Sequence, residues 1–138
     1  MIALEDLQDH TEQEVIDHIA SEYSGDRENS TPTEEQIQKT KQILEQCDIL
    51  IAYESVGSWG CDSSSFFLFK DKKTGGLYEL NGSHCSCYGF EGQFDLEMTT
   101  LESLKKRNEN EYGVFYTGGY DTNESENKKK VKEFIDLL

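Results

Sequence analysis

The chain has 138 residues, which predicts a single domain with enough core to fold without a disulfide or a metal ion. Its 28 acidic residues outnumber its 13 basic residues and give a formal charge of -15, which argues against direct binding to the phosphate backbone of a nucleic acid or to an anionic membrane. Because no segment holds the roughly 20 apolar residues of a membrane span and the first residues lack a secretory signal pattern, we expect a cytosolic protein with reduced cysteines.

A first amphipathic helix is predicted over residues 12–23. Thr11 and Glu14 form the pattern of a capping box, and apolar residues follow at helical spacing. The segment after this helix is polar, which is typical of a linker. We therefore expect residues 1–30 to form an acidic, helical amino-terminal extension and residues 31–138 to form a single α+β domain.

A second helix is predicted to begin near Thr31 and to end near Asp48. Thr31 is a suitable cap, Pro32 suits the first turn, and Glu34 lies where a capping box places its glutamate. These signals are local and favour a helix that begins sharply.

Strands are predicted in the middle of the chain. Residues 49–53 form a short aliphatic run, which is typical of a central strand covered on both faces. Residues 66–69 and 77–80 flank a turn at 71–76 and predict a hairpin. A last strand is predicted at residues 114–116.

Two further helices are predicted in the last third, the first capped by Thr99 with Glu102 and the second opened by Asp121 with Glu124. The strands cluster in the middle of the chain, between helices. This order predicts an α+β fold, in which a small, mainly antiparallel sheet packs with amphipathic helices.

The negative charge is concentrated near the amino terminus. Residues 1–48 hold 13 acidic and 3 basic side chains, which account for -10 of the -15. The plain interpretation is a well-solvated surface. The alternative is that carboxylates imitate the phosphates of a nucleic acid and occupy the basic groove of a nucleic-acid enzyme. Both interpretations remain open at this point.

The most unusual stretch is NGSHCSCYGFEGQF at residues 81–94, which combines two cysteines, a histidine, three glycines and aromatics. Such a mixture suggests either a site built from loops or a tightly packed loop core. A ligand site would lie within residues 57–94. Its candidate residues are Trp59, Cys61, His84, Cys85, Cys87 and Tyr88.

Zinc is one candidate ligand of these loops, because cysteine and histidine are its usual ligands. The spacing argues against it, since Cys85 and Cys87 are separated by one residue where structural sites use two to four. On an extended strand, His84 would also point away from both cysteines. The alternative is buried, reduced cysteines that pack as small apolar side chains. We expect no metal.

Catalytic chemistry has little support in the sequence. The acidic surroundings would raise the pKa of a cysteine nucleophile. A phosphate-binding loop with its lysine is absent, and the glycines lack dinucleotide-binding spacing. His10 and His18 are predicted to be surface residues. We therefore expect no enzymatic activity, no catalytic residue and no cofactor.

Three stretches together carry a resemblance: DILIAY at 48–53, SWGCDSSSF at 58–66 and LYELNGSHCSCYGFEGQF at 77–94. In this combination the chain resembles a group of short proteins that are encoded mostly by tailed bacteriophages and prophages. The resemblance covers residues 48–121 and ends at the sequence YTGGYD. It implies a phage or prophage origin, and it carries no catalytic residue onto this chain.

We therefore expect a small acidic phage-type protein that binds and modulates a host protein in the host cytosol. The target would be a nucleic-acid-binding or defence complex, and an anti-CRISPR-like inhibitor that mimics nucleic acid is one concrete form. The alternative is a small-ligand or zinc-binding module built on residues 57–94. The expected partner-binding residues are Glu12, Asp17, Glu34 and Glu45.

Overall fold

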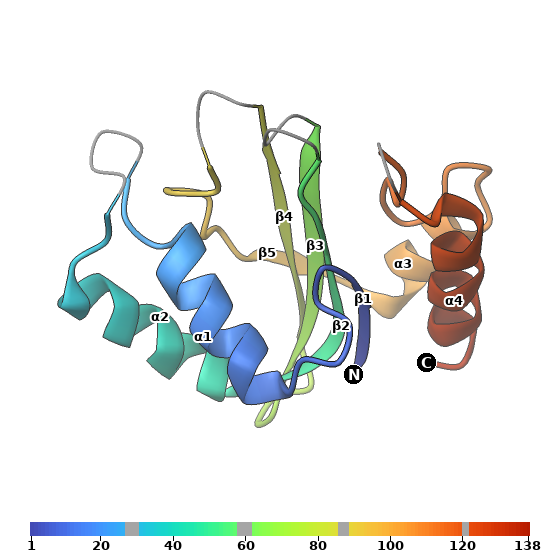
Figure 1. Cartoon of the computed structure of the whole chain (residues 1–138). Coiled ribbons are helices and arrows are strands. Elements are labelled where there is room, and N and C mark those ends of the chain that lie inside the picture. The colour runs from blue at the N-terminus through green and yellow to red at the C-terminus, as the bar shows by residue number, and fades with distance from the viewer. Residues whose placement is uncertain (27–30, 58–61, 86–88, 120–121) are drawn as a thin grey trace.

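The computed structural model of the chain describes residues 1–26, 31–57, 62–85, 89–119 and 122–138 (Figure 1). These residues form four helices and one five-stranded sheet. In chain order the elements are β1 (Ile2–Glu5), α1 (Glu12–Tyr23), α2 (Glu34–Glu45), β2 (Cys47–Ser55), β3 (Ser63–Asp71), β4 (Leu77–His84), β5 (Glu97–Thr99), α3 (Leu101–Asn108) and α4 (Glu124–Asp136).

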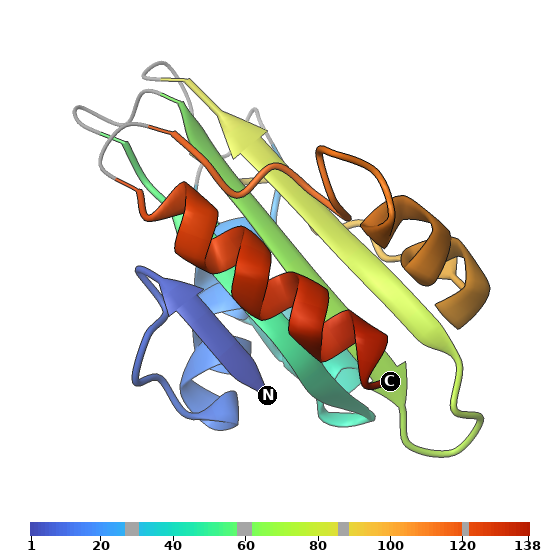
Figure 2. The same cartoon turned by 90° about the vertical axis from the view of Figure 1, so that its right-hand side faces the viewer.

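The sheet has the strand order β1-β2-β3-β4-β5. β1 runs parallel to β2, and the other neighbouring strands are antiparallel. α1 and α2 cover one face of the sheet, while α3 and α4 cover the other (Figures 1 and 2). The predicted α+β class with a mainly antiparallel sheet is confirmed at this level.

Two apolar cores lie on opposite faces of the sheet. Ala52 and Phe67 face the core under α1 and α2, whereas Tyr53 and Phe66 face the core under α3 and α4. Successive side chains of a strand alternate between faces, so each strand supplies both cores. The apolar run Phe66–Phe69 is buried throughout because helices cover both of its faces.

Residues 1–26 are integrated into the sheet and into the first core. β1 pairs with Ile51–Glu54 of β2, and α1 buries five side chains, from Val15 to Tyr23. The sequence predicted an extension in this region because the linker that follows is polar. The linker composition carries no information about β1, whose partner strand lies far along the chain.

Glu5 holds the amino-terminal segment to the last helix. Its backbone has φ 56° at the end of β1. Its carboxylate accepts the backbone N–H of Asn123 at 3.1 Å and the side-chain amide of Asn127 at 2.7 Å. The carboxylate therefore satisfies a donor at the start of α4, where the helix dipole also favours negative charge.

The helix starts differ from the sequence prediction at three caps. The cap of α4 is Asn123, whereas the predicted residue, Asp121, lies outside the described residues. α1 has the expected bounds and the expected capping box. The cap of α2 is Thr33 rather than Thr31, because Gln36 accepts from the Thr33 N–H while Thr33 accepts from the Gln36 N–H. The cap of α3 is Thr100 rather than Thr99.

The strand predicted at residues 114–116 is absent from the structure, which has irregular chain there. Phe115 lies on the face of the sheet, where its ring stacks on Phe66 with centroids 4.2 Å apart. The edge of the sheet beyond β4 is occupied by β5, a short strand that the sequence did not indicate. Residues 114–116 therefore pack against the face of the sheet and do not pair as a strand at its edge.

Candidate functional site

The described part of the NGSHCSCYGFEGQF stretch packs back on itself and on α1. The side chain of Gln93 accepts the Ser83 N–H at 2.9 Å and donates to the Ser83 carbonyl at 2.8 Å. The same amide donates to the Gly89 carbonyl at 3.3 Å, and the Phe94 N–H donates to the carbonyl of Tyr23 at 3.2 Å. These bonds fix the loop against the end of α1.

Phe90 anchors this loop in the first core. It is 5% exposed, and its ring stacks on Tyr23 with centroids 4.7 Å apart. His84 meets the same ring edge-on at 4.4 Å. A Cβ atom at Gly82 would lie 2.4 Å from Ser65 Oγ and 3.0 Å from Phe90, so the close approach of β4 to these groups requires glycine. Gly82 and Phe90 are therefore core positions of the stretch, whereas Ser83 and Cys85 are exposed.

The candidate ligands of this loop region can be placed only in part. His84 donates from Nδ1 to the Cys85 carbonyl at 2.8 Å, and Cys85 is exposed. The remaining candidates lie outside the described residues, and they are Trp59, Cys61, Cys87 and Tyr88. Within the described residues, no three potential ligands from histidine, cysteine, aspartate and glutamate gather as a metal site would require.

We predict that the purified protein holds no stoichiometric zinc and that a chelator leaves its melting temperature unchanged. The reasons are the poor ligand spacing and a core large enough to fold unaided. Native mass spectrometry before and after chelation checks this result. One tightly held zinc per chain would contradict the prediction, and it would make Cys61, His84, Cys85 and Cys87 the ligands to test.

A buried carboxylate links α1 to the sheet. Glu54 on β2 is 3% exposed and accepts two hydrogen bonds from α1. Tyr23 donates its hydroxyl to Oε1, and His18 donates from Nε2 to Oε2 at 2.8 Å. The bond to Glu54 raises the pKa of the His18 imidazole although partial burial opposes it. Burial raises the pKa of the Tyr23 phenol well above its ordinary value.

The Glu54 network adds to the prediction that His18 is a surface residue, because the His18 side chain is 29% exposed on α1 and also bonds to a buried carboxylate. Its three side chains pair with one another beneath α1 and hold the helix on the sheet. Sequence reasoning missed it because positions 18, 23 and 54 are far apart. A lone carboxylate at the end of an apolar strand was the available signal, since a buried charge requires a partner.

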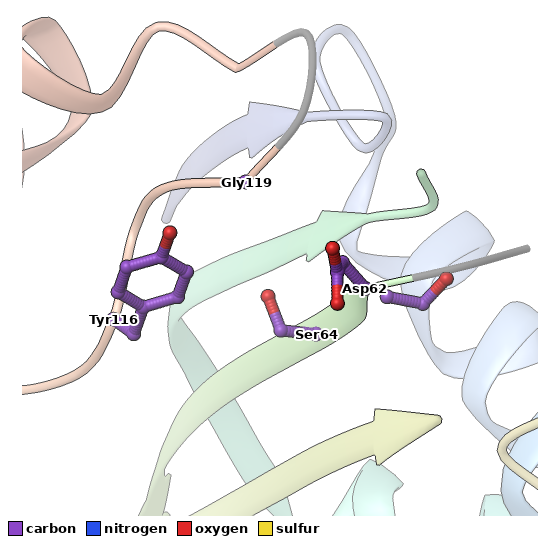
Figure 3. A pocket seen from close by; sticks show the side chains of 5 residues that line it. Asp62, Ser64, Tyr116 and Gly119 are labelled. Atoms are coloured by element: carbon purple, nitrogen blue, oxygen red, sulfur yellow. The ribbon is translucent and has the colours of Figure 1, made fainter. Parts of the chain in front are cut away.

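A cavity of about 520 Å³ opens at the other face of the sheet, at the start of β3 (Figure 3). Ser64 lies between Asp62 and Tyr116, and Gly119 lies opposite. The hydroxyl oxygens of Ser64 and Tyr53 are buried, and the Tyr53 hydroxyl lies beside those of Ser64 and Ser55. The cavity therefore combines a carboxylate, from Asp62, with the exposed aromatic ring of Tyr116.

Two of the four predicted partner-binding residues have structural roles. The Glu12 carboxylate accepts the Ile49 N–H at 2.9 Å, where the pairing of β2 with β3 is irregular. Asp17 accepts from the Gln13 amide at 3.0 Å and lies 3.5 Å from the Lys41 ammonium. A substitution at Glu12 would therefore disturb the fold as well as the surface.

The other two predicted residues lie on the solvent-exposed surface of α2. Glu34 accepts from the Gln38 amide at 2.9 Å, and Glu45 is exposed at the end of the helix. Glu22 on α1 and Glu35 on α2 are exposed as well, although neither was among the predicted partner-binding residues. These four glutamates (Glu22, Glu34, Glu35 and Glu45) are called the acidic set below.

The two helix layers differ in charge. α1 and α2 together hold seven acidic and two basic side chains, whereas α3 and α4 hold five acidic and seven basic ones. Figure 1 shows these pairs of helices on opposite sides of the sheet. The helices α1 and α2 therefore carry a net charge of -5, and α3 and α4 carry one of +2.

Comparison with known proteins found no relative of this chain. A scan of protein-family models, a search of curated proteins and a search of solved structures all returned no match. Within the described parts of the chain, no helix is long and apolar enough to cross a membrane.

Proposed function

We propose that this chain is a non-enzymatic protein of phage or prophage origin that binds and modulates a host protein in the host cytosol. The contact surface is the outer side of α1 and α2. The partner presents a basic surface, and a nucleic-acid-binding or defence complex is the class that offers one. Occupation of its basic groove by carboxylates in place of phosphates would inhibit it, as in an anti-CRISPR-like inhibitor.

The observation that carries the proposal is the segregation of charge between the helix layers. Seven acidic and two basic side chains lie on α1 and α2, and the acidic set is exposed there. A surface of one sign attracts a partner of the opposite sign over the distance of a Debye length, about 8 Å at physiological salt.

The titratable groups under α1 have a structural role in this proposal. The imidazole of His18 and the phenol of Tyr23 both bond to the Glu54 carboxylate under α1. Groups held in such a network stabilise the fold.

The alternative function is a small-ligand or zinc-binding module built on residues 57–94. It has less support, because Phe90, Gly82 and Gln93 all serve the packing of the loop. His84 also has a partner in the Cys85 carbonyl.

Neutralising the acidic set is expected to abolish capture of the host partner. The variant carries Glu22→Gln, Glu34→Gln, Glu35→Gln and Glu45→Gln. These side chains are exposed, so the fold should survive, as exposed charges contribute little to stability. The measurement is a pull-down from host lysate with wild type and variant, at physiological and at high salt. The protein captured by the wild type at physiological salt should be absent with the variant and at high salt.

The matched control removes the same number of charges from the opposite side of the molecule. It carries Glu102→Gln, Glu109→Gln, Glu111→Gln and Glu133→Gln, all at exposed positions. Both variants therefore have the same net charge. Equal capture by both variants would contradict the proposed surface, and loss of capture by the control alone would move the contact to α3 and α4.

A further inference from the structure

We propose that the outer edge of β5 binds an extended segment of another protein in which basic and apolar residues alternate. The segment adds to the five-stranded sheet as a further strand. β5 is the last strand of the sheet, and β4 is its one neighbour among the described strands (Figure 1). The acidic set lies elsewhere, on α1 and α2. The edge can therefore bind its partner whether or not the acidic set contacts a host protein.

The backbone of Met98 offers free hydrogen-bonding groups at this edge. The side chain of Gln93 bonds both the N–H and the carbonyl of Ser83, so these groups of β4 point away from β3. Backbone groups alternate in direction along a strand, so those of Glu79 point the same way and meet those of Glu97. The next residue, Met98, therefore directs its N–H and carbonyl outward. Among the described residues, no hydrogen bond outside the ladders of the sheet uses either group.

The side chains of β5 alternate between an apolar and an acidic face. Met98 is 80% exposed and lies opposite Tyr78, which packs against the first core. Leu96, two residues earlier, packs against the same core. Glu97 is exposed and lies opposite Glu79 on the other face of the sheet. An added strand has the same period of two, so its apolar residues would lie beside Met98 and the residues between them beside Glu97.

The charge at Glu97 selects basic residues in the added strand. Like charges directly opposite one another on neighbouring strands are unfavourable, and Glu79 lies opposite Glu97. Arg107 of α3 pairs with Glu79 at 2.6 Å, whereas no ion pair within the described parts of the chain includes Glu97. A lysine or arginine opposite Glu97 would provide a cation for it. An acidic residue there would instead add a third carboxylate to the row.

A second copy of this chain is the poorer occupant of the edge. Each copy carries a formal charge of -15, so two copies repel each other. β5 itself has the sequence Glu-Met-Thr, and it offers no cation to the Glu97 of another copy. A segment of another protein that carries basic residues meets neither obstacle.

The test is a titration of isotope-labelled full-length protein with short peptides, followed by amide resonances and amide hydrogen exchange in NMR spectra. The probe alternates lysine and valine and is long enough to pair with the whole of β5. It should shift the resonances of residues 96–99 in a saturable manner. It should also slow hydrogen exchange at the Met98 N–H, because that group gains an acceptor.

Two comparison peptides test the pattern and the charge. The first has the composition of the probe, but its lysines and valines stand in separate blocks. The second alternates glutamate and valine. Both should bind at this edge at least about tenfold more weakly than the probe, because the first breaks the period of two and the second opposes Glu97 with a like charge.

Variants test the two groups that the proposal assigns to the edge. Glu97→Lys should weaken binding of the probe about tenfold, since an attraction becomes a repulsion. Met98→Pro removes the outward N–H and should also weaken binding, while proline is tolerated in an edge strand where the N–H faces solvent. Glu133→Lys is the matched control, because it makes the same charge change at an exposed position of α4 and should leave the affinity unchanged.

Three results would overturn the proposal. The probe could leave residues 96–99 unshifted, or shift only α1 and α2, which would place the cationic peptide on the acidic set. Glu133→Lys could weaken binding as much as Glu97→Lys, which would reduce the effect to net charge. Shifts at residues 97–99 that grow with protein concentration in the absence of peptide would make a second copy the occupant.

Discussion

Replacement of Phe90 by alanine is expected to lower the free energy of unfolding by about 3–5 kcal/mol, the range for emptying a large aromatic side chain from a core. Phe90 is 5% exposed and stacks on Tyr23 at 4.7 Å, while His84 meets its ring edge-on at 4.4 Å. The rest of the loop cannot collapse into the space, because Gln93 clamps it to Ser83. Urea denaturation of both proteins measures the difference.

The control for Phe90 is Tyr112→Ala. Tyr112 is 76% exposed, so its removal should change the free energy of unfolding by no more than about 0.5 kcal/mol. If Phe90→Ala melted like the wild type but lost partner binding, Phe90 would be a contact residue. The interpretation of the loop as core would then be wrong.

Replacement of Glu54 by alanine is expected to lower the free energy of unfolding by about 3 kcal/mol. This value is the lower end of the range for removing one partner of a buried ion pair. The lower end applies because the His18 side chain is 29% exposed and can lose its proton when its carboxylate is gone. The Tyr23 hydroxyl is left buried without its acceptor, which adds to the loss. Denaturation in urea at fixed pH checks the value.

Glu54→Gln is the matched control, because its amide can still accept from Tyr23. It should lose less stability than the alanine variant. The free energy of unfolding should also depend on pH differently in the wild type and in Glu54→Gln. The pKa of His18 is raised in the folded state, chiefly by its bond to Glu54. The ion pair therefore contributes fully below the ordinary histidine pKa of about 6.5, and its contribution is lost as the pH rises through the raised pKa. The same decline in Glu54→Gln would contradict this account.

The sequence predicted correctly those helix starts and turns that are held by hydrogen bonds between residues close together in the chain. Thr11 and Glu14 predicted the start of α1 because each bonds the backbone of the other within one turn. The hairpin of β3 and β4 was predicted from its turn, in which Asp71 accepts the N–H groups of Lys73 and Thr74. These contacts span at most three residues, so composition and spacing reveal them.

Pairing between distant segments escaped the sequence analysis. β1 is a strand because Ile2–Glu5 finds an open edge of β2, and nothing within the first residues indicates that edge. Residues 114–116 have the apolar and aromatic composition of a strand, yet Phe115 packs on the face of the sheet. The composition of residues 114–116 indicates that they are buried. Whether they pair as a strand depends on which edges of the folded sheet are open.

The candidate site was predicted in part for the same reason. The excess of acidic over basic residues near the amino terminus was visible in the sequence, and Glu34 and Glu45 are exposed as expected. The role of Glu12 was hidden, since the Ile49 N–H that it accepts lies on another element. The cavity at the start of β3 was hidden as well, because it forms between β3 and the segment of Tyr116 and Gly119, which lies far along the chain.

The association rate with the captured host protein tests the central claim most directly. Surface plasmon resonance would measure it for the wild type, the acidic-set variant and the matched control over a range of salt concentrations. We expect the wild-type and control rates to fall steeply as salt rises, because the steering charges are screened. The acidic-set variant should associate slowly at low salt and respond little to salt, while its dissociation rate changes less. Equal association rates for all three proteins, without salt dependence in the wild type, would contradict the account and leave the acidic surface of α1 and α2 as solvation alone.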